Sequence, residues 1–330
     1  MARTHLATAA QLRALLSSYA EEDRPRFLSV ASQIAAKAAR DGNSELAGEL
    51  LELVAASKEQ AERRQSPDII PIARPVGELS GLVTAQYPTT RLSEMVLDPS
   101  VRESLSRVIR EYRNSEQLQV RGLEPRRKLL LIGPPGCGKS MTATALAGEL
   151  GRPLLQVQLH ALIAKFMGET AAKLHLIFDA MGKAPGVYLF DEFDALGAQR
   201  GADNDVGEAR RILNSFLVLL EQESSRSLIV AATNLPEMLD DALFRRFDDV
   251  IRYAPPSAGM VETLIRNRLA QFNTTTLSMD KVVRLAKGLS HGDIVKACED
   301  AAKETVLDGK GRILTGTLVK ALKSRVRTTD

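Results

Sequence analysis

The chain has 330 residues, of which 44% are hydrophobic, and its 44 basic and 41 acidic residues give a formal net charge of +3. This length can bury a core and form two or three domains, whereas the near balance of charge argues against nucleic acid or an anionic membrane as the main partner. No apolar run approaches the roughly 20 residues that span a bilayer, and the two cysteines, Cys137 and Cys298, lie in patterns that do not suit a disulfide, so we expect a soluble protein of the reducing cytoplasm.

The first part of the chain carries three helical patterns. Apolar residues recur at helical spacing within residues 6–19, 27–35 and 46–54, and stop signals separate these stretches. The patterns predict a small helical bundle over residues 1–61. Residues 62–90 are polar and contain prolines, so we expect a linker there.

The next pattern is an apolar run followed by a glycine-rich loop. Residues 129–132, Leu-Leu-Leu-Ile, predict an interior strand, and Gly-Pro-Pro-Gly-Cys-Gly-Lys-Ser follows at 133–140. Glycines let successive backbone N–H groups converge on an anion, and the helical pattern after the loop would point its positive end at that anion. In such a phosphate loop Lys139 would reach the outer phosphates and Ser140 would bind Mg²⁺. The residues predicted to contact the nucleotide here are Gly133, Pro134, Pro135, Gly136, Cys137, Gly138, Lys139, Ser140 and Met141.

A second apolar run ends in two carboxylates. Residues 187–190, Val-Tyr-Leu-Phe, predict another interior strand, and Asp191 and Glu192 follow at its carboxyl end, where parallel sheets bind ligands. In a phosphoryl-transfer site Asp191 would hold Mg²⁺ and Glu192 would polarise the attacking water. The alternative is that both residues only begin a loop and cap the next helix. The room for a helix, a strand and a second helix between Lys139 and Asp191 favours catalysis.

With these two motifs the chain resembles the AAA ATPases and, within them, the classical branch of ring-forming protein remodellers. The resemblance covers residues 92–322. It implies an α/β fold, a P-loop NTPase parallel sheet flanked by helices, over residues 91–257, behind the N-terminal helical bundle. Four helical patterns after the Pro-Pro pair at 255–256 agree with a small α-helical lid domain over residues 258–330. The implied cofactors are ATP and Mg²⁺, and the implied reaction is ATP hydrolysis.

A third strand-like stretch carries the resemblance further. Residues 227–234 predict a strand with a polar tip at Asn234. In the family the corresponding Asn places the lytic water near the γ-phosphate, which implies a catalytic role for Asn234. The alternative is a turn-forming Asn before Pro236.

Residues 240–248 resemble the second region of homology of the classical members and contain Arg245 and Arg246. In the family such arginines enter the site of the neighbouring subunit and neutralise charge on the γ-phosphate. The resemblance therefore implies a homo-oligomer, a hexameric ring in the family. A solvated pair that binds Asp248 and Asp249 is the alternative.

Lys165, Phe166, Met167 and Gly168 resemble the family's pore loop, which projects into the channel of the ring. A flat aromatic side chain there grips an extended polypeptide, and the glycine lets the loop move. The alternative places Phe166 and Met167 in the core at a loop end. Residues 200–208 are polar and contain glycine, which suits either a second pore loop or a plain exposed connection.

Two further positions are compared with the family. Gln158 aligns with a polar residue that can hold the catalytic Glu inactive until a partner engages. Residues 288–294 fit the lid segment, in which Gly292 would contact the nucleotide, but His291-Gly292 stands where classical members usually have Gly-Ala. His291 adds bulk, a hydrogen-bond donor or a pH-sensitive group, unless it is a tolerated substitution or a helix cap.

The main hypothesis is an ATP-hydrolysing ring motor that remodels or threads a protein substrate through its pore, with the bundle at residues 1–61 binding a substrate or an adaptor or else serving as a structural extension. A second hypothesis is a nucleotide-gated regulator that activates a partner effector when the ring assembles or disassembles. The layout also resembles small bacterial AAA proteins that accompany subtilisin-like serine proteases in anti-phage systems. A nucleic-acid motor is the weakest reading, because no basic patch is interleaved with aromatic residues.

Overall fold

The structure is a computed structural model that describes residues 77–162, 167–196, 205–238, 241–309 and 311–326. It also describes seven helical residues nearer the N-terminus: Ala31, Ile34, Ala35, Ala38, Gly48, Glu49 and Glu52. The chain divides into two compact units, Met1–Ile72 and Ala73–Asp330. The rest of the predicted bundle, and residues 62–76 of the predicted linker, lie outside the described residues.

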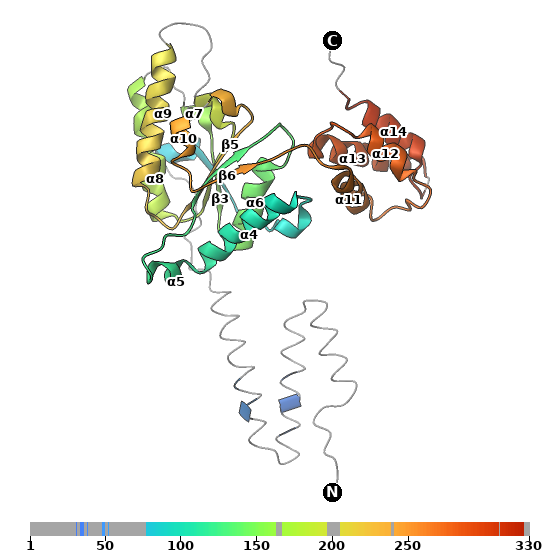
Figure 1. The fold of residues 1–330 in the computed structure, drawn as a ribbon, viewed down its shortest axis with the longest axis horizontal. Coiled ribbons are helices and arrows are strands. Elements are labelled where there is room, and N and C mark those ends of the chain that lie inside the picture. Colours follow the sequence, from blue (N-terminus) through green and yellow to red (C-terminus); the bar gives the residue numbers. More distant parts are fainter. Residues whose placement is uncertain are drawn as a thin grey trace. The chain divides into compact units, whose positions relative to one another are not determined.

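A six-stranded sheet forms the centre of the second unit (Figure 1). Its strand order is β1-β3-β4-β5-β2-β6, and every neighbouring pair is parallel except β1 with β3. The interior strands are buried along almost their whole length, as their unbroken apolar sequences predict. The predicted α/β fold is therefore confirmed. The strands are β1 (Val83–Gln86), β2 (Lys128–Ile132), β3 (Leu154–Val157), β4 (Val187–Phe190), β5 (Leu228–Thr233) and β6 (Asp249–Arg252).

The antiparallel edge strand β1 lies within the stretch that the sequence suggested as a linker. Val83 pairs with Val157 of β3, and Gln86 pairs with Leu154. Only Val83 of this strand is fully buried, so a four-residue segment with two polar side chains carries a weak strand signal. The sheet domain therefore begins earlier in the chain than residue 91, with the 3-10 helix η1 (Gly77–Gly81) in front of β1.

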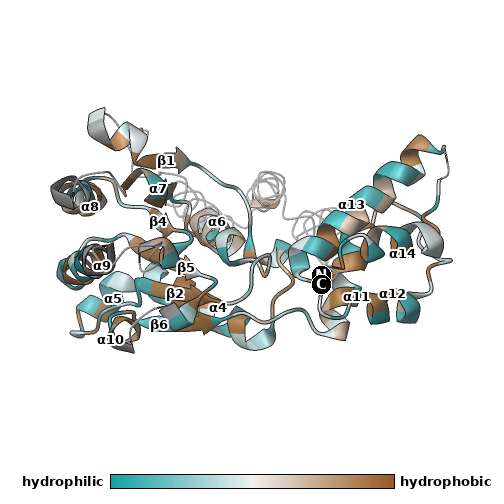
Figure 2. Cartoon of the chain, turned by 90° about the horizontal axis from the view of Figure 1, so that it is seen from above, coloured by the Kyte–Doolittle hydropathy of each residue, from teal (hydrophilic) through white to brown (hydrophobic). Residues whose placement is uncertain are grey.

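Helices cover both faces of the sheet (Figures 1 and 2). On one face lie α8 (Met167–Lys183) and α9 (Asp205–Gln222), and Phe178, Phe190 and Phe216 pack there with ring centroids 5.1 to 6.2 Å apart. On the other face lie α4 (Pro99–Arg113) and α6 (Lys139–Leu150), which bury a separate cluster of aliphatic side chains. Both faces of the interior strands are thus removed from water. The shorter elements are η2 (Leu92–Glu94), α5 (Ser115–Gln119), α7 (Leu159–Leu162), η3 (Phe193–Leu196), η4 (Pro236–Met238) and α10 (Asp241–Phe244).

The chain then forms a helical lid with a core of its own. Its helices are α11 (Ala258–Arg268), α12 (Met279–Leu285), α13 (His291–Leu307) and α14 (Thr315–Lys323). Ile265, Ile294 and Leu318 are fully buried within it. The end of the strand–helix alternation after residue 256 predicted this change, and the lid agrees with that expectation.

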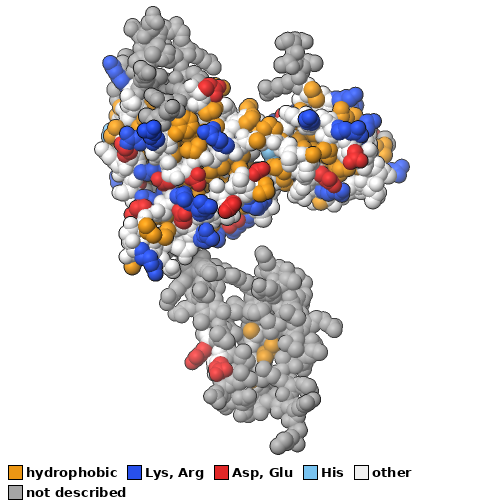
Figure 3. All heavy atoms as spheres, viewed as in Figure 1, with side chains coloured by type: hydrophobic (Ala, Val, Ile, Leu, Met, Phe, Trp, Pro, Cys, Tyr) orange, Lys and Arg blue, Asp and Glu red, His pale blue; other side chains and the backbone are white. Residues whose placement is uncertain are grey.

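The surface of the described residues is mixed in charge. On the face in Figure 3, basic and acidic side chains are interspersed instead of forming one basic surface. Among the described helices, none has both the length and the apolar character needed to cross a membrane. This surface gives no support to the nucleic-acid reading of the sequence.

Candidate nucleotide site

The loop between β2 and α6 has the backbone shape of a phosphate cradle. Gly133 and Gly136 have φ values of 153° and 77°, and a Cβ at Gly133 would lie 2.5 Å from the carbonyl oxygen of Tyr253. A residue with a side chain therefore does not fit at position 133. Helix α6 begins at Lys139 without a side-chain cap at Gly138. Its first N–H groups remain available for an anion, as the sequence predicts.

Lys139 lies at the centre of this loop and is only 6% exposed. Its ammonium group donates to the carbonyl oxygens of Gly133 (2.6 Å) and Pro134 (3.0 Å) and to Oδ1 of Asn234 (2.5 Å). Burial lowers the pKa of Lys139, and the carboxylates of Asp191 and Asp194 oppose this shift. Asn234, at the end of β5, is thus brought directly to the phosphate loop.

Ser140 and Asp191 meet beside this lysine. The Ser140 hydroxyl donates to the Asp191 carboxylate over 2.5 Å. A hydroxyl and a carboxylate oxygen are ligands that Mg²⁺ prefers, and Mg²⁺ usually takes one or two protein oxygens together with substrate phosphates. Two protein oxygens therefore fit a magnesium ion that is bound together with nucleotide phosphates.

Glu192 follows Asp191 in an uncommon backbone conformation. Its φ is 52°, the only positive value for a non-glycine residue in the described part of the chain. Its N–H donates to Oδ1 of Asp191 over 3.0 Å, and its side chain is exposed at the mouth of the site. Such strained conformations concentrate at functional sites, where the surrounding structure holds them in place.

Asp194 is a site residue that the sequence did not reveal. Its Oδ1 accepts hydrogen bonds from the Thr233 hydroxyl (2.9 Å) and from the Asn234 N–H (3.3 Å). These bonds fix the end of β5 and so orient Asn234 toward Lys139. The signal was a carboxylate two residues beyond the Asp-Glu pair, but no sequence rule links it to a strand so far along the chain.

The polar cluster opens into a cavity of about 680 Å³ between the sheet domain and the lid. Its lining includes nearly the whole phosphate loop, Met141, Asp191, Glu192, Asn234 and Gly292, all of them predicted from the sequence. The sequence missed a second group of lining residues: Met95, Val96, Leu97, Leu264, Asn267 and Arg268. This group comes from the end of η2 and from α11, where ordinary apolar and helical patterns gave no functional signal.

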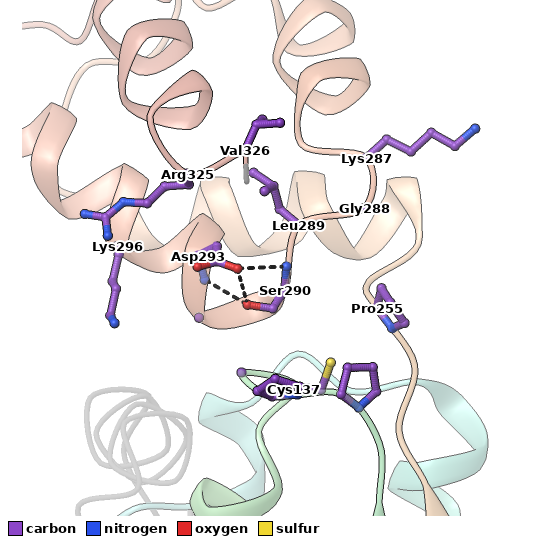
Figure 4. A pocket seen from close by; sticks show the side chains of 14 residues that line it. Cys137, Pro255, Lys287, Gly288, Leu289, Ser290, Asp293, Lys296, Arg325 and Val326 are labelled. Carbon is purple, nitrogen blue, oxygen red and sulfur yellow. Dashed lines mark hydrogen bonds between the residues drawn. The ribbon is translucent and has the colours of Figure 1, made fainter. Parts of the chain in front are cut away.

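The lid touches the phosphate loop through main-chain atoms. The N–H of Gly292 donates to the carbonyl oxygen of Gly136 over 2.9 Å. A Cβ at Gly136 would lie 2.4 Å from the Ser290 hydroxyl oxygen, so no larger residue fits. Figure 4 shows Ser290 and Asp293 of the lid facing Cys137 of the loop across a neighbouring cavity of about 490 Å³.

Cys137 and Cys298 are both buried and free. Cys137 belongs to the phosphate loop, whereas Cys298 lies in the core of the lid. Burial raises the pKa of both thiols. Each thiol is therefore held in its neutral form.

Arg245 and Arg246 are not brought to this cavity. Both follow α10 with exposed side chains, and Arg246 forms an ion pair with Glu221 of α9. Asp248, their suggested partner, instead accepts the N–H groups of Arg127 (2.7 Å) and Lys128 (2.9 Å). Arg245 and Arg246 therefore lie on the exposed surface, away from the cavity of their own chain.

The predicted pore loop is only partly described. Lys165 and Phe166 lie outside the described residues, and Met167 and Gly168 form the start of α8. Of the suggested second pore loop, residues 200–204 also lie outside the described residues. Gln158 follows β3, and its N–H donates to the carbonyl oxygen of Leu82; it is not among the residues that line the cavity.

Together, a parallel sheet, a phosphate loop at the end of β2, paired carboxylates at the end of β4 and a polar residue at the end of β5 define a P-loop nucleoside triphosphatase domain with a helical lid. Comparison with known proteins narrows this class. Residues 129–254 match the family "ATPase family associated with various cellular activities (AAA)". The chain belongs to the AAA family of ATPases, as predicted, and the reaction of that family is ATP hydrolysis.

Two relatives and one solved structure are similar to this chain over a larger part of its length than the family match. An uncharacterized AAA family ATPase of Sinorhizobium fredii, y4kL, is 30% identical over 319 residues, covering 96% of this chain and 94% of that protein. The proteasome-activating nucleotidase of Thermococcus onnurineus is 29% identical over 252 residues, covering 74% of this chain and 63% of that protein. The crystal structure of the FIGL-1 AAA domain is similar in fold, with a TM-score of 0.61 and 22% identity over 80% of this chain and 91% of that one.

Proposed function

We propose that this chain hydrolyses ATP in the cavity between its phosphate loop and its lid, and uses the energy to remodel or thread a protein substrate. The observation that carries the proposal is the meeting of Lys139, Ser140, Asp191 and Asn234. These residues come from three strand ends, yet two hydrogen bonds of 2.5 Å connect them.

Each residue then has a separate task. Lys139 neutralises charge on the outer phosphates, and Ser140 and Asp191 hold Mg²⁺, which when bound would polarise the phosphates. Glu192 accepts a proton from the attacking water, and Asn234, fixed by Asp194, positions that water. Gly292 closes the lid against the loop. The site thus has groups to bind, orient and activate, all within the described part of one subunit.

Phosphoryl transfer commonly uses an arginine that neutralises charge on the γ-phosphate, and the described lining of the cavity offers no unpaired arginine for this role. Among the described residues that line the cavity, Arg268 is the one arginine, and it forms an ion pair with Glu299. We therefore assign the finger role to Arg245 and Arg246 of a neighbouring subunit in a homohexamer. Their exposure and their position away from their own cavity support this assignment.

The use of the energy is inferred from the pore loop and from the relatives. Phe166, with Lys165, Met167 and Gly168, would grip an extended polypeptide in the channel of the ring. The relatives include an ATP-dependent zinc metalloprotease, FtsH of Helicobacter pylori, 30% identical over 237 residues. The bundle at residues 1–61 would bind the substrate or an adaptor. The competing proposal is a nucleotide-gated regulator that activates a partner, for example a serine protease in anti-phage defence.

The first experiment compares the wild type with Glu192→Gln in the presence of ATP and Mg²⁺. Particle mass and phosphate release are measured together. We expect the variant to lose turnover by about 10² to 10⁴-fold and to accumulate as a six-subunit species, because ATP stays bound. A variant that turns over ATP at the wild-type rate would refute the site assignment. If both proteins stay monomeric, assembly requires a partner, which favours the regulator.

Phe166→Ala separates the two uses of ATP. A threading motor should lose processing of a protein substrate while basal ATP turnover is kept, because the grip and the hydrolytic site are different groups. A regulator should keep its effect on the partner. Exposed His175 on α8 provides a matched control, since His175→Ala should alter neither measurement.

A further inference from the structure

A pair of buried hydroxyl groups lies beside the phosphate loop. Thr142, in the first turn of α6, is fully buried, and Tyr253, which follows β6, is 7% exposed. Their hydroxyl oxygens are 2.6 Å apart. The Thr142 hydroxyl donates to the carbonyl oxygen of Gly138 over 3.0 Å, so the Tyr253 hydroxyl donates to the oxygen of Thr142. Two successive hydrogen bonds therefore connect Tyr253 to the loop.

The last acceptor of this connection belongs to a peptide group of the anion site. The Gly138 carbonyl and the Lys139 N–H share one planar peptide group, and in a trans peptide they point in opposite directions. Fixing the carbonyl therefore fixes the direction of the N–H at the start of α6, which the uncapped helix leaves available for phosphate. Hydrogen bonds to the carbonyl also polarise the peptide group and strengthen its N–H as a donor.

Tyr253 adds what α6 cannot supply by itself. A threonine on a helix often bonds to the carbonyl four residues before it, so the bond from Thr142 is an ordinary local one. Tyr253 lies 111 residues further along the chain and holds the Thr142 hydroxyl from the other side. Tyr253 also packs on the start of the loop, since a Cβ at Gly133 would lie 2.8 Å from the Tyr253 Cβ. One side chain thus contacts the phosphate loop near both of its ends.

The Tyr253 hydroxyl is suited to a fixed donor role. Burial raises the pKa of Tyr253 to about 12, and the hydrogen bond with Thr142 opposes this shift. The hydroxyl therefore keeps its proton at neutral pH. Neither Tyr253 nor Thr142 is among the described residues that line the nucleotide cavity, so any effect on the nucleotide passes through the loop.

We propose that Tyr253 is a positioning residue for ATP binding, which acts through Thr142 to hold the peptide group of Gly138 and Lys139 in the orientation that receives the phosphates. This inference rests on the proposed assignment of the phosphate loop to ATP. Tyr253 takes no part in the chemical step, which is left to Glu192 and Asn234.

The test measures binding by calorimetry in the Glu192→Gln background, where ATP is not consumed. The probes are ATP and inorganic tripolyphosphate, each with Mg²⁺. We expect Tyr253→Phe, which keeps the shape of the side chain, to weaken both by the same factor of about two to ten, the size of one hydrogen bond. With Glu192 present, KM should rise while kcat changes by less than about twofold, because the loop meets the phosphates both before and during the reaction.

Tyr188→Phe is a matched control for the loss of a buried hydroxyl. Tyr188 of β4 is 1% exposed, and its hydroxyl donates to the carbonyl oxygen of Ala184 over 3.0 Å, away from the phosphate loop. Denaturant unfolding should show a similar loss of stability in Tyr188→Phe and Tyr253→Phe. Only Tyr253→Phe should lose affinity for tripolyphosphate.

Variants of Thr142 test the route. Thr142→Ser keeps the hydroxyl and should bind tripolyphosphate as the parent does, whereas Thr142→Val should lose at least as much affinity as Tyr253→Phe. Because the two side chains act in series, the double variant should bind no more weakly than Thr142→Val alone. Additive losses, or equal affinities of Tyr253→Phe and Tyr188→Phe, would overturn the role of Tyr253. A parent protein that binds neither probe would overturn the site assignment itself.

Discussion

At the scale of single residues, Glu192 has the most strained backbone conformation among the described non-glycine residues, with a φ of 52°. A left-handed conformation costs an L-residue roughly 1 to 2 kcal/mol relative to its usual regions, and Glu192 has no special tolerance for it. The hydrogen bond from its N–H to Asp191 and the packing of Phe193 immediately after it keep the turn in place. Glu192 is exposed and lines the nucleotide cavity in this conformation.

Replacing Glu192 with glycine should therefore separate stability from activity. Glu192→Gly removes the strain and should raise the free energy of unfolding by about 1 kcal/mol relative to Glu192→Gln, while both variants lose ATP turnover. Denaturant unfolding and phosphate release measure the two effects. Equal stability of the two variants would show that the turn at Glu192 is not strained.

His291 should make stability depend on pH in a defined window. Its folded-state pKa lies below 6.5 because of burial, so the unfolded chain takes up a proton more readily. The sign follows: above about pH 6.5 the ring is neutral in both states, and stability falls as the pH drops below that value until the folded-state pKa is reached. The charged residues that line the cavity together with His291 are Glu94, Lys139, Asp191, Glu192 and Arg268, and Asp293 and Lys296 lie on its own helix.

The comparison of wild type with His291→Gln isolates the contribution of the His291 ring to the pH dependence of stability. The charged residues Glu94, Arg268 and Asp293 remain in both proteins. Urea unfolding is measured at pH 7.5, 6.0 and 5.0. As the pH falls, the unfolding free energy of the wild type should decrease relative to that of His291→Gln. A difference that stays constant across these pH values would contradict a buried neutral ring.

These residues also show what the sequence can and cannot reveal about a site. Lys139, Ser140, Asp191 and Asn234 follow apolar runs, and since parallel strands end at one edge of the sheet, their meeting was predictable. No comparable sequence pattern, such as an apolar run ending in a polar residue, identifies Asp194, Val96 and Asn267 as site residues. Their places depend on how a turn, an N-terminal segment and a lid helix pack around the cavity, which no short-range pattern specifies.

At the scale of elements, α6 is held at both of its ends. Its start forms the phosphate loop, and near its end a Cβ at Gly148 would lie 2.1 Å from the carbonyl oxygen of Thr90. Arg91 in turn donates to the carbonyl oxygen of Gly148. The segment before α4 thus lies directly on this helix, and the close backbone approach depends on a residue without a side chain.

Gly148→Ala should consequently destabilise the protein, although alanine is the better helix former. We expect a loss of roughly 1 to 3 kcal/mol from overpacking. Gly182 on α8 offers a matched control, because a Cβ there meets nothing within 4 Å, so Gly182→Ala should be stabilising by about 0.4 to 1 kcal/mol. Denaturant unfolding of both variants checks the contrast, and a stabilised Gly148→Ala would show that Thr90 can move away.

The helices and strands differ in how well they could be predicted from their own sequences. Strands β2, β4 and β5 and the lid helices have strong apolar patterns and were predicted. Strand β1 was not, because it is short, lies at the sheet edge and has half of its side chains polar. Its existence depends on pairing with β3, a tertiary contact.

At the scale of the whole molecule, the role proposed for the arginine pair means that one subunit would complete the site of another. Arg245 forms no ion pair with any described residue, and the Arg246 side chain pairs with Glu221 on the surface. We expect Arg245→Ala to lose turnover while its own site remains intact, because the arginine acts on a neighbour. By analogy with arginine fingers of GTPases the loss could reach about 10³-fold or more.

Mixing two inactive variants tests this directly. Lys139→Ala lacks a working site but keeps its arginines, whereas Arg245→Ala keeps the site. If the arginine acts in trans, a mixture should recover measurable phosphate release at interfaces that combine an intact site with an intact arginine. Either variant mixed only with itself serves as the control. Full activity of Arg245→Ala alone would contradict the assignment to this residue.

The contact between the lid and the phosphate loop has a consequence for how such proteins diverge. Its donor and acceptor, the N–H of Gly292 and the carbonyl oxygen of Gly136, belong to the main chain. Side chains nearby can therefore drift without erasing the bond, and only an imino acid at residue 292 would delete the donor itself. This hydrogen bond between the lid and the phosphate loop therefore does not depend on which side chain stands at a neighbouring position such as 291.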